Sequence, residues 1–180
     1  MARVAARAAP GLNHPHANGE PIATRAAGSP WRRRARNGAL GPRGAPPLEL
    51  RTLDGQPLAL ADLRGKVVLV NFWATWCEPC VEEMPSLQRL RDRLGAARCE
   101  VLAVNYQEGE PRIRAFLQKV PLDLPIVRDT DGGVARAWKV RIFPTTFVVD
   151  ADQSIRYLLT GGLDWAEPAV ERRIRALLPR

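Results

Sequence analysis

Hydrophobic and polar positions follow a regular pattern only from Pro47 onward. The stretch 66–73 (KVVLVNFW) is an almost unbroken apolar run, which is typical of a central strand covered on both faces. The segment that follows carries apolar residues at helical spacing, namely Met84, Leu87, Leu90 and Leu94. We therefore predict a central strand that leads directly into a long amphipathic helix.

Shorter patterns on both sides complete the set of predicted elements. Asp54-Gly55 between two short apolar segments indicates a β-hairpin near the start of the fold. We further predict strands at 100–105, 145–150 and 155–160, and a short extended segment at 124–127. Helices are predicted to open at Pro111, to span 131–138 and to follow 164–167, whose sequence resembles a capping box. Strand–helix–strand units imply parallel pairing, and the late hairpin adds antiparallel strands. The fold class is therefore α/β, a mixed sheet with helices on both faces and an N-terminal β-hairpin.

Residues 1–46 differ from the rest in composition. They are rich in Ala, Arg, Gly and Pro, so we predict a disordered tail at 1–46 and one folded domain at 47–180. The formal net charge is +8, but residues 1–47 hold eight arginines against Glu20 alone, which leaves +1 for 48–180. Because the basic charge lies in the tail and not on the fold, we predict no nucleic-acid partner. The sequence contains neither a recognisable signal peptide nor an apolar stretch approaching the roughly 20 residues of a spanning helix.

The cysteines and histidines narrow the chemistry. Both histidines lie in the tail, and the fold holds Cys77, Cys80 and Cys99. A structural zinc site needs about four ligands, and a copper carrier usually adds histidine or methionine to its cysteines, so we predict no metal. A purely structural disulfide across three residues would close too short a loop to stabilise the fold much. These comparisons favour redox exchange by Cys77 and Cys80, and we expect Cys99 to be a buried, inert thiol.

Cys77 and Cys80 fall where the central strand meets the long helix. Unpaired N–H groups and the positive end of the helix dipole favour an anion there, so the pKa of Cys77 should lie below its usual value. Cys77 would attack a substrate disulfide as the thiolate, and Cys80, one turn further along and more buried, would resolve the mixed disulfide. Glu78 opposes thiolate formation, and Pro79 stiffens the first turn. We expect a modest net depression of the Cys77 pKa, which favours a reductant over a strong oxidant.

The stretches ADLRGKVVLVNFWATWCEPCVEEMPSL and FPTTFVVD resemble the TlpA/ResA branch of thioredoxin-fold thiol-disulfide oxidoreductases, from about Leu48 to the end. The resemblance implies a thioredoxin-like fold, disulfide-bearing protein substrates and a periplasmic or other extracytoplasmic setting, with the cytoplasm as the alternative. Many members keep cysteines reduced for cytochrome c maturation or similar assembly tasks, and a membrane thiol transporter would supply the electrons. We expect a monomer that needs no cofactor beyond a redox-active Cys77–Cys80 disulfide.

The resemblance also implies roles for residues outside the cysteine motif. Pro144 would be a cis-proline beside the redox pair, where the backbone of Phe143, with Thr145 next to it, meets an extended substrate; an ordinary trans-proline is the alternative. Trp76 would cover the site and shape docking. Glu108 aligns with an acidic residue near the redox site of some members, and a buried carboxylate there could exchange the resolving proton with Cys80; a solvated loop glutamate is the alternative.

Two other classes of function compete with this one. A thiol peroxidase of the peroxiredoxin kind shares the outline of a hairpin followed by a thioredoxin-like domain. Peroxiredoxins have Thr three residues before the attacking Cys and Pro four residues before that Thr, whereas this chain has Ala74 and Val70 there. A non-catalytic binding module is disfavoured by the intact WCEPC motif. We therefore predict a thiol-disulfide oxidoreductase that works in the reductive direction, with thiol peroxidase as the alternative.

Overall fold

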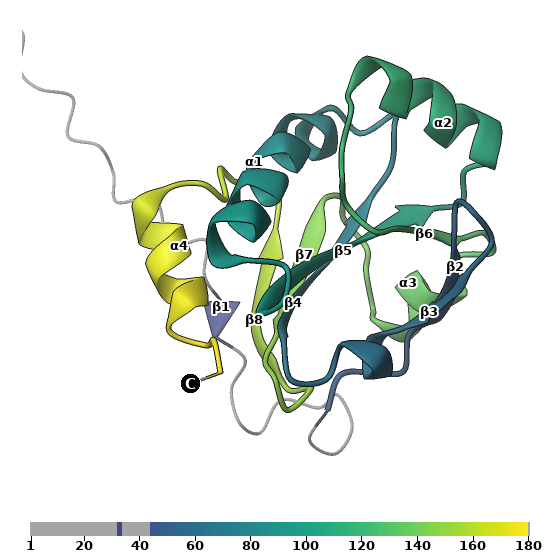
Figure 1. The fold of residues 1–180 in the computed structure, drawn as a ribbon. Coiled ribbons are helices and arrows are strands. Elements are labelled where there is room, and N and C mark those ends of the chain that lie inside the picture. Colours follow the sequence, from purple (N-terminus) through teal and green to yellow (C-terminus); the bar gives the residue numbers. More distant parts are fainter. Residues whose placement is uncertain (1–31, 34–43, 180) are drawn as a thin grey trace, which may run out of the picture.

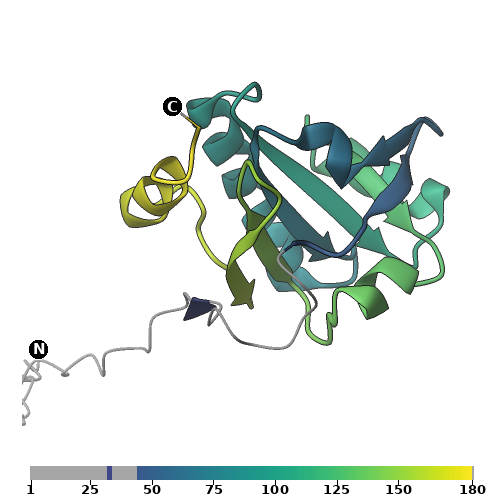
Figure 2. The same ribbon diagram turned by 90° about the horizontal axis from the view of Figure 1, so that it is seen from below.

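The computed structural model describes residues 32–33 and 44–179, which form one mixed sheet with helices on both faces (Figure 1, Figure 2). The strands are β1 (Arg32–Arg33), β2 (Glu49–Thr52), β3 (Pro57–Ala59), β4 (Val67–Trp73), β5 (Cys99–Tyr106), β6 (Ile126–Asp129), β7 (Thr145–Val149) and β8 (Ile155–Thr160). The helices are α1 (Glu78–Leu94), α2 (Glu110–Lys119), α3 (Gly133–Ala137) and α4 (Pro168–Arg175), with a 3-10 turn, η1, at Leu60–Leu63.

The strand order places β4 near the middle of the sheet. The order is β1–β8–β7–β4–β5–β6–β2–β3, in which β4, β5 and β6 run parallel and the other neighbours pair antiparallel. All seven residues of β4 are buried, because β5 and β7 flank it and helices cover its faces. The predicted central strand and the predicted α/β mixed sheet are confirmed.

Each face of the sheet has its own apolar core, because successive residues of a strand point to opposite faces. Val67 of β4 packs with Leu87 of α1 on the face that α4 also covers. Val68 packs with Trp138, which follows α3, on the other face. The four apolar positions predicted to face inward from α1 are all buried, namely Met84, Leu87, Leu90 and Leu94. The sequence pattern of α1 therefore holds this helix against the sheet and positions its first turn.

The N-terminal hairpin forms as predicted. Strands β2 and β3 pair antiparallel, and Gly55 in the turn between them has a φ of +79°, which costs glycine little because it has no Cβ. β2 also pairs with β6, so the hairpin extends the main sheet. β6 itself begins at Ile126, within the short extended segment expected at 124–127.

The predicted capping box at 164–167 is wrong. The last helix begins at Pro168 with Glu167 as its N-cap residue, and no side chain caps it. The Asp164 carboxylate instead accepts a hydrogen bond from the N–H of Ala166, which closes a local turn before the helix. Proline suits the first helical position because its missing N–H would have no partner there.

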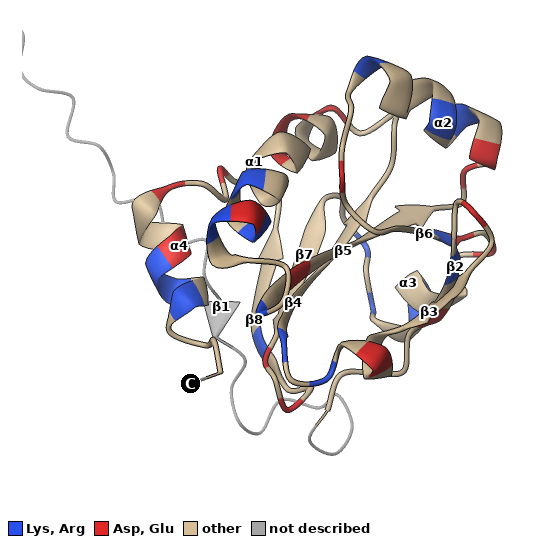
Figure 3. Cartoon of the chain, in the orientation of Figure 1, with Lys and Arg blue, Asp and Glu red and all other residues tan. Residues whose placement is uncertain are grey.

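Only part of the predicted tail belongs to the described residues. β1 pairs antiparallel with β8, and the N–H of Ala45 donates to the carbonyl of Gln153 at 2.8 Å. The remaining residues of the predicted disorder at 1–46 lie outside the described part, so the domain boundary at Pro47 stays a prediction. Acidic and basic residues are interspersed over the helices, with several arginines on α4 (Figure 3). In the described residues no helix combines the length and the apolar character needed to cross a bilayer.

Candidate active site

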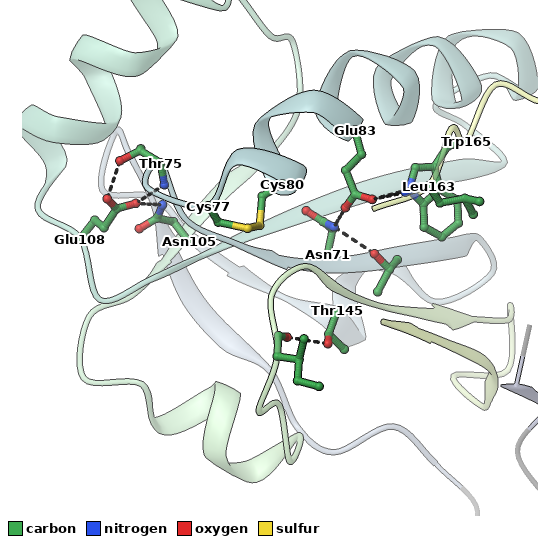
Figure 4. Close-up of a disulfide and its surroundings, with 12 residues drawn as sticks. Asn71, Thr75, Cys77, Cys80, Glu83, Asn105, Glu108, Thr145, Leu163 and Trp165 are labelled. Atoms are coloured by element: carbon green, nitrogen blue, oxygen red, sulfur yellow. Dashed lines mark hydrogen bonds between the residues drawn. A yellow bond between two sulfur atoms is a disulfide. The ribbon is translucent and has the colours of Figure 1, made fainter. Parts of the chain in front are cut away.

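Cys77 and Cys80 form a disulfide at the junction of β4 and α1 (Figure 4). Cys77 is the N-cap residue of α1, and its carbonyl accepts the N–H of Val81 at 3.1 Å, the first bond of the helix. Cys77 is 6% exposed and Cys80 is fully buried. The predicted position of Cys77 at a helix N-terminus and the deeper burial of Cys80 are confirmed, and they give the two sulfurs different access to a partner protein.

The two residues between the cysteines are both exposed. Glu78 and Pro79 occupy the first two positions of α1, where a carboxylate meets the positive end of the helix dipole and proline lacks an N–H that would have no partner. Gly162 packs against this turn, because a Cβ at that position would lie 3.4 Å from the Cβ of Pro79. The loop after β8 therefore forms one wall beside the disulfide.

An exposed apolar surface lies beside Cys77. Trp76 is 57% exposed, and its ring lies 5.8 Å from that of Phe143, which in turn lies 4.9 Å from the ring of Tyr106. Ile142, which no sequence motif marked, is 59% exposed. The peptide bond from Phe143 to Pro144 is cis, as the resemblance implied.

Thr145, which follows the cis-proline Pro144 in the chain, is buried. Its hydroxyl donates to the carbonyl of Ile142 at 2.7 Å, closing the loop that carries Phe143 and Pro144. The hydroxyl of Thr145 therefore supports the loop, and only its backbone remains as a candidate for contact with a substrate.

Glu108 is buried on the Cys77 side of the disulfide (Figure 4). Its carboxylate accepts hydrogen bonds from the backbone N–H of Thr75 at 2.7 Å, from the Thr75 hydroxyl and from the amide of Asn105 at 2.8 Å. Arg112, one helical turn away, lies 2.9 Å from the same carboxylate. The alternative of a solvated loop glutamate is wrong, because this side chain ties the turn before Cys77 to α2 and β5.

A second buried carboxylate, Glu83, lies one helical turn after Cys80. One oxygen accepts from the Asn71 amide at 2.7 Å; the other accepts from the N–H of Leu163 at 3.1 Å and from the Trp165 indole at 3.2 Å. Burial raises the pKa of Glu83 to about 7, although the hydrogen bonds from Trp165, Asn71 and Leu163 act to lower it. This carboxyl can therefore hold or release a proton near neutral pH.

Glu83 was not identified from the sequence as a site residue, although the residue spacing along α1 indicates that its side chain is buried. Cys80, Glu83, Met84 and Leu87 follow the i, i+3, i+4, i+7 spacing of a single helix face. Because Met84 and Leu87 were expected to face inward, the same spacing places Glu83 among buried residues. A groove of about 530 Å³ passes over it, lined by Pro79, Glu82 and Arg89 of α1 and by Gly162 and Asp164 of the following loop.

Cys99 lies apart from this site at the start of β5. It is free and fully buried, and burial raises the pKa of its thiol to about 12. The expectation of a buried thiol is confirmed, and a thiol with such a pKa is a poor nucleophile at neutral pH. Among the described residues, no three side chains of the His, Cys, Asp and Glu types gather as metal ligands would.

A disulfide at the start of the helix that follows a central strand, with a cis-proline after Phe143, which packs against the apolar cluster that contains both cysteines, defines the class of thioredoxin-fold thiol-disulfide oxidoreductases. Within the families of this fold, the model of the AhpC/TSA family matches residues 43–158, and the chain belongs to that family.

Individual relatives agree with this class. The thiol-disulfide oxidoreductase ResA of Geobacillus kaustophilus is 36% identical over 135 residues, which cover 75% of this chain and 76% of the relative. The thioredoxin-like protein YneN of Bacillus subtilis is 38% identical over 120 residues, which cover 65% and 69% of the two chains. Among solved structures, a thiol:disulfide interchange protein from Chlorobium tepidum superimposes with a TM-score of 0.67 at 26% identity, covering 77% of this chain and 98% of that one. The predicted thioredoxin-like fold and thiol-disulfide oxidoreductase activity on protein disulfides are confirmed.

Proposed function

We propose that this oxidoreductase works as a reductase of protein disulfides, with the Cys77–Cys80 dithiol as the electron donor. The reductive direction rests on the resemblance to the TlpA/ResA branch. The observation that carries the exchange itself is the unequal access of the two sulfurs, since Cys77 is 6% exposed at a helix N-terminus and Cys80 is fully buried. A surface thiolate can meet a substrate disulfide, whereas a buried partner can attack only the mixed disulfide that forms next to it.

The reaction balances over two thiol-disulfide exchanges. The Cys77 thiolate attacks one sulfur of the substrate disulfide, so that a mixed disulfide forms and one substrate thiolate leaves. Cys80 then loses its proton and attacks the Cys77 sulfur, which forms the Cys77–Cys80 disulfide and releases the second substrate thiolate. Two electrons pass to the substrate, and the proton of Cys80 needs an acceptor near a buried sulfur.

Glu83 is the better-supported proton acceptor. It lies one helical turn from Cys80, and a pKa near 7 suits a group that must both take up and give back a proton at neutral pH. Proton exchange between Glu108 and Cys80 was the sequence-based expectation and stays a prediction. The contacts of Glu108 favour a different role, in which it holds Thr75 and thereby the turn that presents Trp76 and Cys77.

Substrate docking would use the apolar surface beside Cys77. Trp76 and Ile142 are the exposed large apolar side chains of the described residues, and Phe143 lies against Trp76. The backbone of Phe143 and Thr145 on either side of Pro144 would hydrogen-bond an extended substrate segment, as the resemblance to the TlpA/ResA branch implies. Glu78 and Pro79 would border the same segment on the helix side, because both are exposed between the cysteines.

The setting and the partners follow from the same resemblance. An extracytoplasmic location, a membrane thiol transporter as electron donor, a monomeric state and a task in cytochrome c maturation are all part of this proposal. A reductase in an oxidising compartment needs an outside electron source, because substrate disulfides persist there. The similarity to proteins called ResA supports the assembly task.

Insulin reduction with a dithiol donor tests the activity, and titration in a redox buffer tests its direction. A midpoint near −270 mV is expected for a reductant, and one near −120 mV would make the protein an oxidant and contradict the proposal. Cys77→Ser should abolish insulin reduction, and Cys99→Ala is the matched control that should keep it. Peroxide consumption with the same thiol donor tests the peroxidase alternative, which Ala74 in place of threonine disfavours.

A further inference from the structure

The hydrogen bonds of Glu83 restrict where a proton can sit on its carboxyl group. The N–H of Leu163 and the indole N–H of Trp165 both donate to Oε2, and neither group can accept a hydrogen bond from a protonated Oε2. Oε1 has a different partner, the side-chain amide of Asn71 at 2.7 Å. A protonated Glu83 that keeps the bonds to Leu163 and Trp165 must therefore carry its hydrogen on Oε1.

The amide of Asn71 faces Oε1 with the wrong group for a protonated carboxyl. Its Nδ2 donates both to Glu83 and to the hydroxyl of Thr146, which lies 2.9 Å away on β7. An NH₂ group has no acceptor capacity, so it cannot receive the hydrogen of a protonated Oε1. The carbonyl Oδ1 of Asn71 could receive it, and this oxygen is buried with no hydrogen-bond partner in the described residues. The acceptor that a protonated Glu83 requires is therefore present on the same amide, as the unbonded Oδ1 of Asn71.

We propose that Asn71 is a positioning residue whose side-chain amide reverses when Glu83 takes up a proton. With Glu83 ionised, Nδ2 donates to Oε1 and to Thr146. With Glu83 protonated, the amide turns by half a rotation, so that Oδ1 accepts from the Glu83 hydroxyl and from the Thr146 hydroxyl. Asn71 then satisfies both protonation states of a buried carboxyl. The consequence for catalysis rests on the proposed role of Glu83 as proton acceptor, but the reversal itself does not.

Among the groups around Glu83, Asn71 is the one whose hydrogen bonds would change when Glu83 is protonated. The residues that contact Glu83 or its partner amide from β4 and β7, Asn71 and Thr146, are neutral. The charged and titratable groups near Glu83 are the sulfur of Cys80 in the reduced protein and the residues that line the groove, namely Glu82 and Arg89 on α1 and Asp164 on the loop after β8. Arg89 and Asp164 lie 3.9 Å apart and are both largely exposed, so neither is part of the buried network.

The reversal can be observed by NMR on the oxidised full-length protein, without any substrate. Above the titration midpoint of the Glu83 carboxyl carbon, nuclear Overhauser contacts should join the Asn71 side-chain NH₂ to protons of Thr146; below it they should be lost. In Glu83→Gln the contacts between the Asn71 NH₂ and Thr146 should be absent at every pH. The reason is that the new amide can donate to Oδ1 as a protonated carboxyl does. The amide of Asn105, bonded to Glu108, is the internal control and should not change. Contacts to Thr146 that stay constant through the Glu83 titration would overturn the proposal.

A variant separates this role from simple structural support. Asn71→Leu removes the partner of both states, and a bond to a charged acceptor is worth more than one to a neutral group. The midpoint of Glu83 should therefore rise by about one pH unit in Asn71→Leu. A destabilised Asn71→Leu protein with an unchanged midpoint would contradict the proposal. Failure of insulin reduction in the wild-type protein would sink the proposed function and leave the titration result intact.

Discussion

Two buried glutamates flank the disulfide, and their surroundings differ in kind. Glu108, on the Cys77 side, accepts from Thr75 and Asn105 and lies 2.9 Å from the guanidinium of Arg112. Glu83, on the Cys80 side, accepts only from neutral N–H groups in its described hydrogen bonds, which come from Asn71, Leu163 and Trp165. Both carboxyls are nearly inaccessible, yet only one has a cation beside it.

The comparison shows that burial alone does not decide what a carboxyl does. A cation and several donors hold a carboxylate in one position, so Glu108 is suited to fixing a turn. Without a cation, desolvation dominates, and the Glu83 pKa rises to about 7. In the proposed mechanism the same residue type therefore serves as a structural clamp next to one sulfur and as a proton carrier next to the other.

The largest expected effect is on stability and its pH dependence. The pKa of Glu83 is about 7 in the folded protein, against an ordinary value of 4.5. Between these pH values the folded state binds more protons than the unfolded state, so the free energy of unfolding falls as pH rises from 4.5 to 7. The loss is absent below pH 4.5, complete above pH 7 and worth up to about 3 kcal/mol. Glu83→Gln should remove this dependence and raise the free energy of unfolding at pH 8. Urea denaturation at pH 5 and pH 8 measures it, with the exposed neighbour in Glu82→Gln as control. An unaltered pH dependence in Glu83→Gln would contradict the assignment.

The next effect is on the rate of exchange. Glu83→Gln should slow insulin reduction about 100-fold at pH 7, because general acid–base catalysis by a placed group contributes at least that much. The variant would then be more stable at pH 8 and less active. Stopped-flow measurement of the mixed-disulfide resolution step locates the loss. If Glu108→Gln slowed that step as much and Glu83→Gln did not, Glu108 would be the proton carrier and Glu83 the structural carboxyl.

A smaller effect of opposite sign is expected on the other side of the disulfide. Glu108→Gln should lower the free energy of unfolding by about 1–3 kcal/mol, because the new NH₂ group faces donors and leaves them without an acceptor. The same denaturation series measures it. A stabilising effect at pH 8 like that of Glu83→Gln would show that the clamp is not the main role of Glu108.

The smallest effect concerns the partner of Glu108. The Arg112 side chain is 63% exposed, so Arg112→Gln should cost under about 1 kcal/mol, as exposed ion pairs usually do. The alkylation rate of Cys77 in the reduced protein should change by less than about threefold. A loss as large as that of Glu108→Gln would mean that the ion pair, and not the bonds to Thr75, holds the turn.

Much of this molecule could be predicted from local patterns. The apolar run of β4 and the helical spacing of α1 located the junction where Cys77 and Cys80 lie, because both elements are held by burial that the sequence displays directly. The predicted start of α4 was wrong because Asp164 makes a turn with Ala166, and such local competition is not visible in a motif.

Contacts between distant segments could not be predicted in the same way. The four segments that meet at Glu83 come from β4, α1, β7 and the loop after β8, and only the fold brings Asn71 and Trp165 to the same carboxyl. Ile142 became notable only when the structure exposed it, next in sequence to Phe143, whose ring lies against Trp76. The helical spacing of Glu83 relative to Cys80 was visible in advance, but adjacent glutamates in a helix usually face solvent, as Glu82 does.

Cys99 has a practical consequence for any study of this protein. Its thiol is buried, with a pKa of about 12, and therefore escapes modification while the chain stays folded. Under native conditions a mass increase of one alkyl group, at Cys77, would mark the dithiol, and none would mark the disulfide. Intact-mass spectrometry can thus read out the oxidation state of the wild-type chain without first removing the third sulfur.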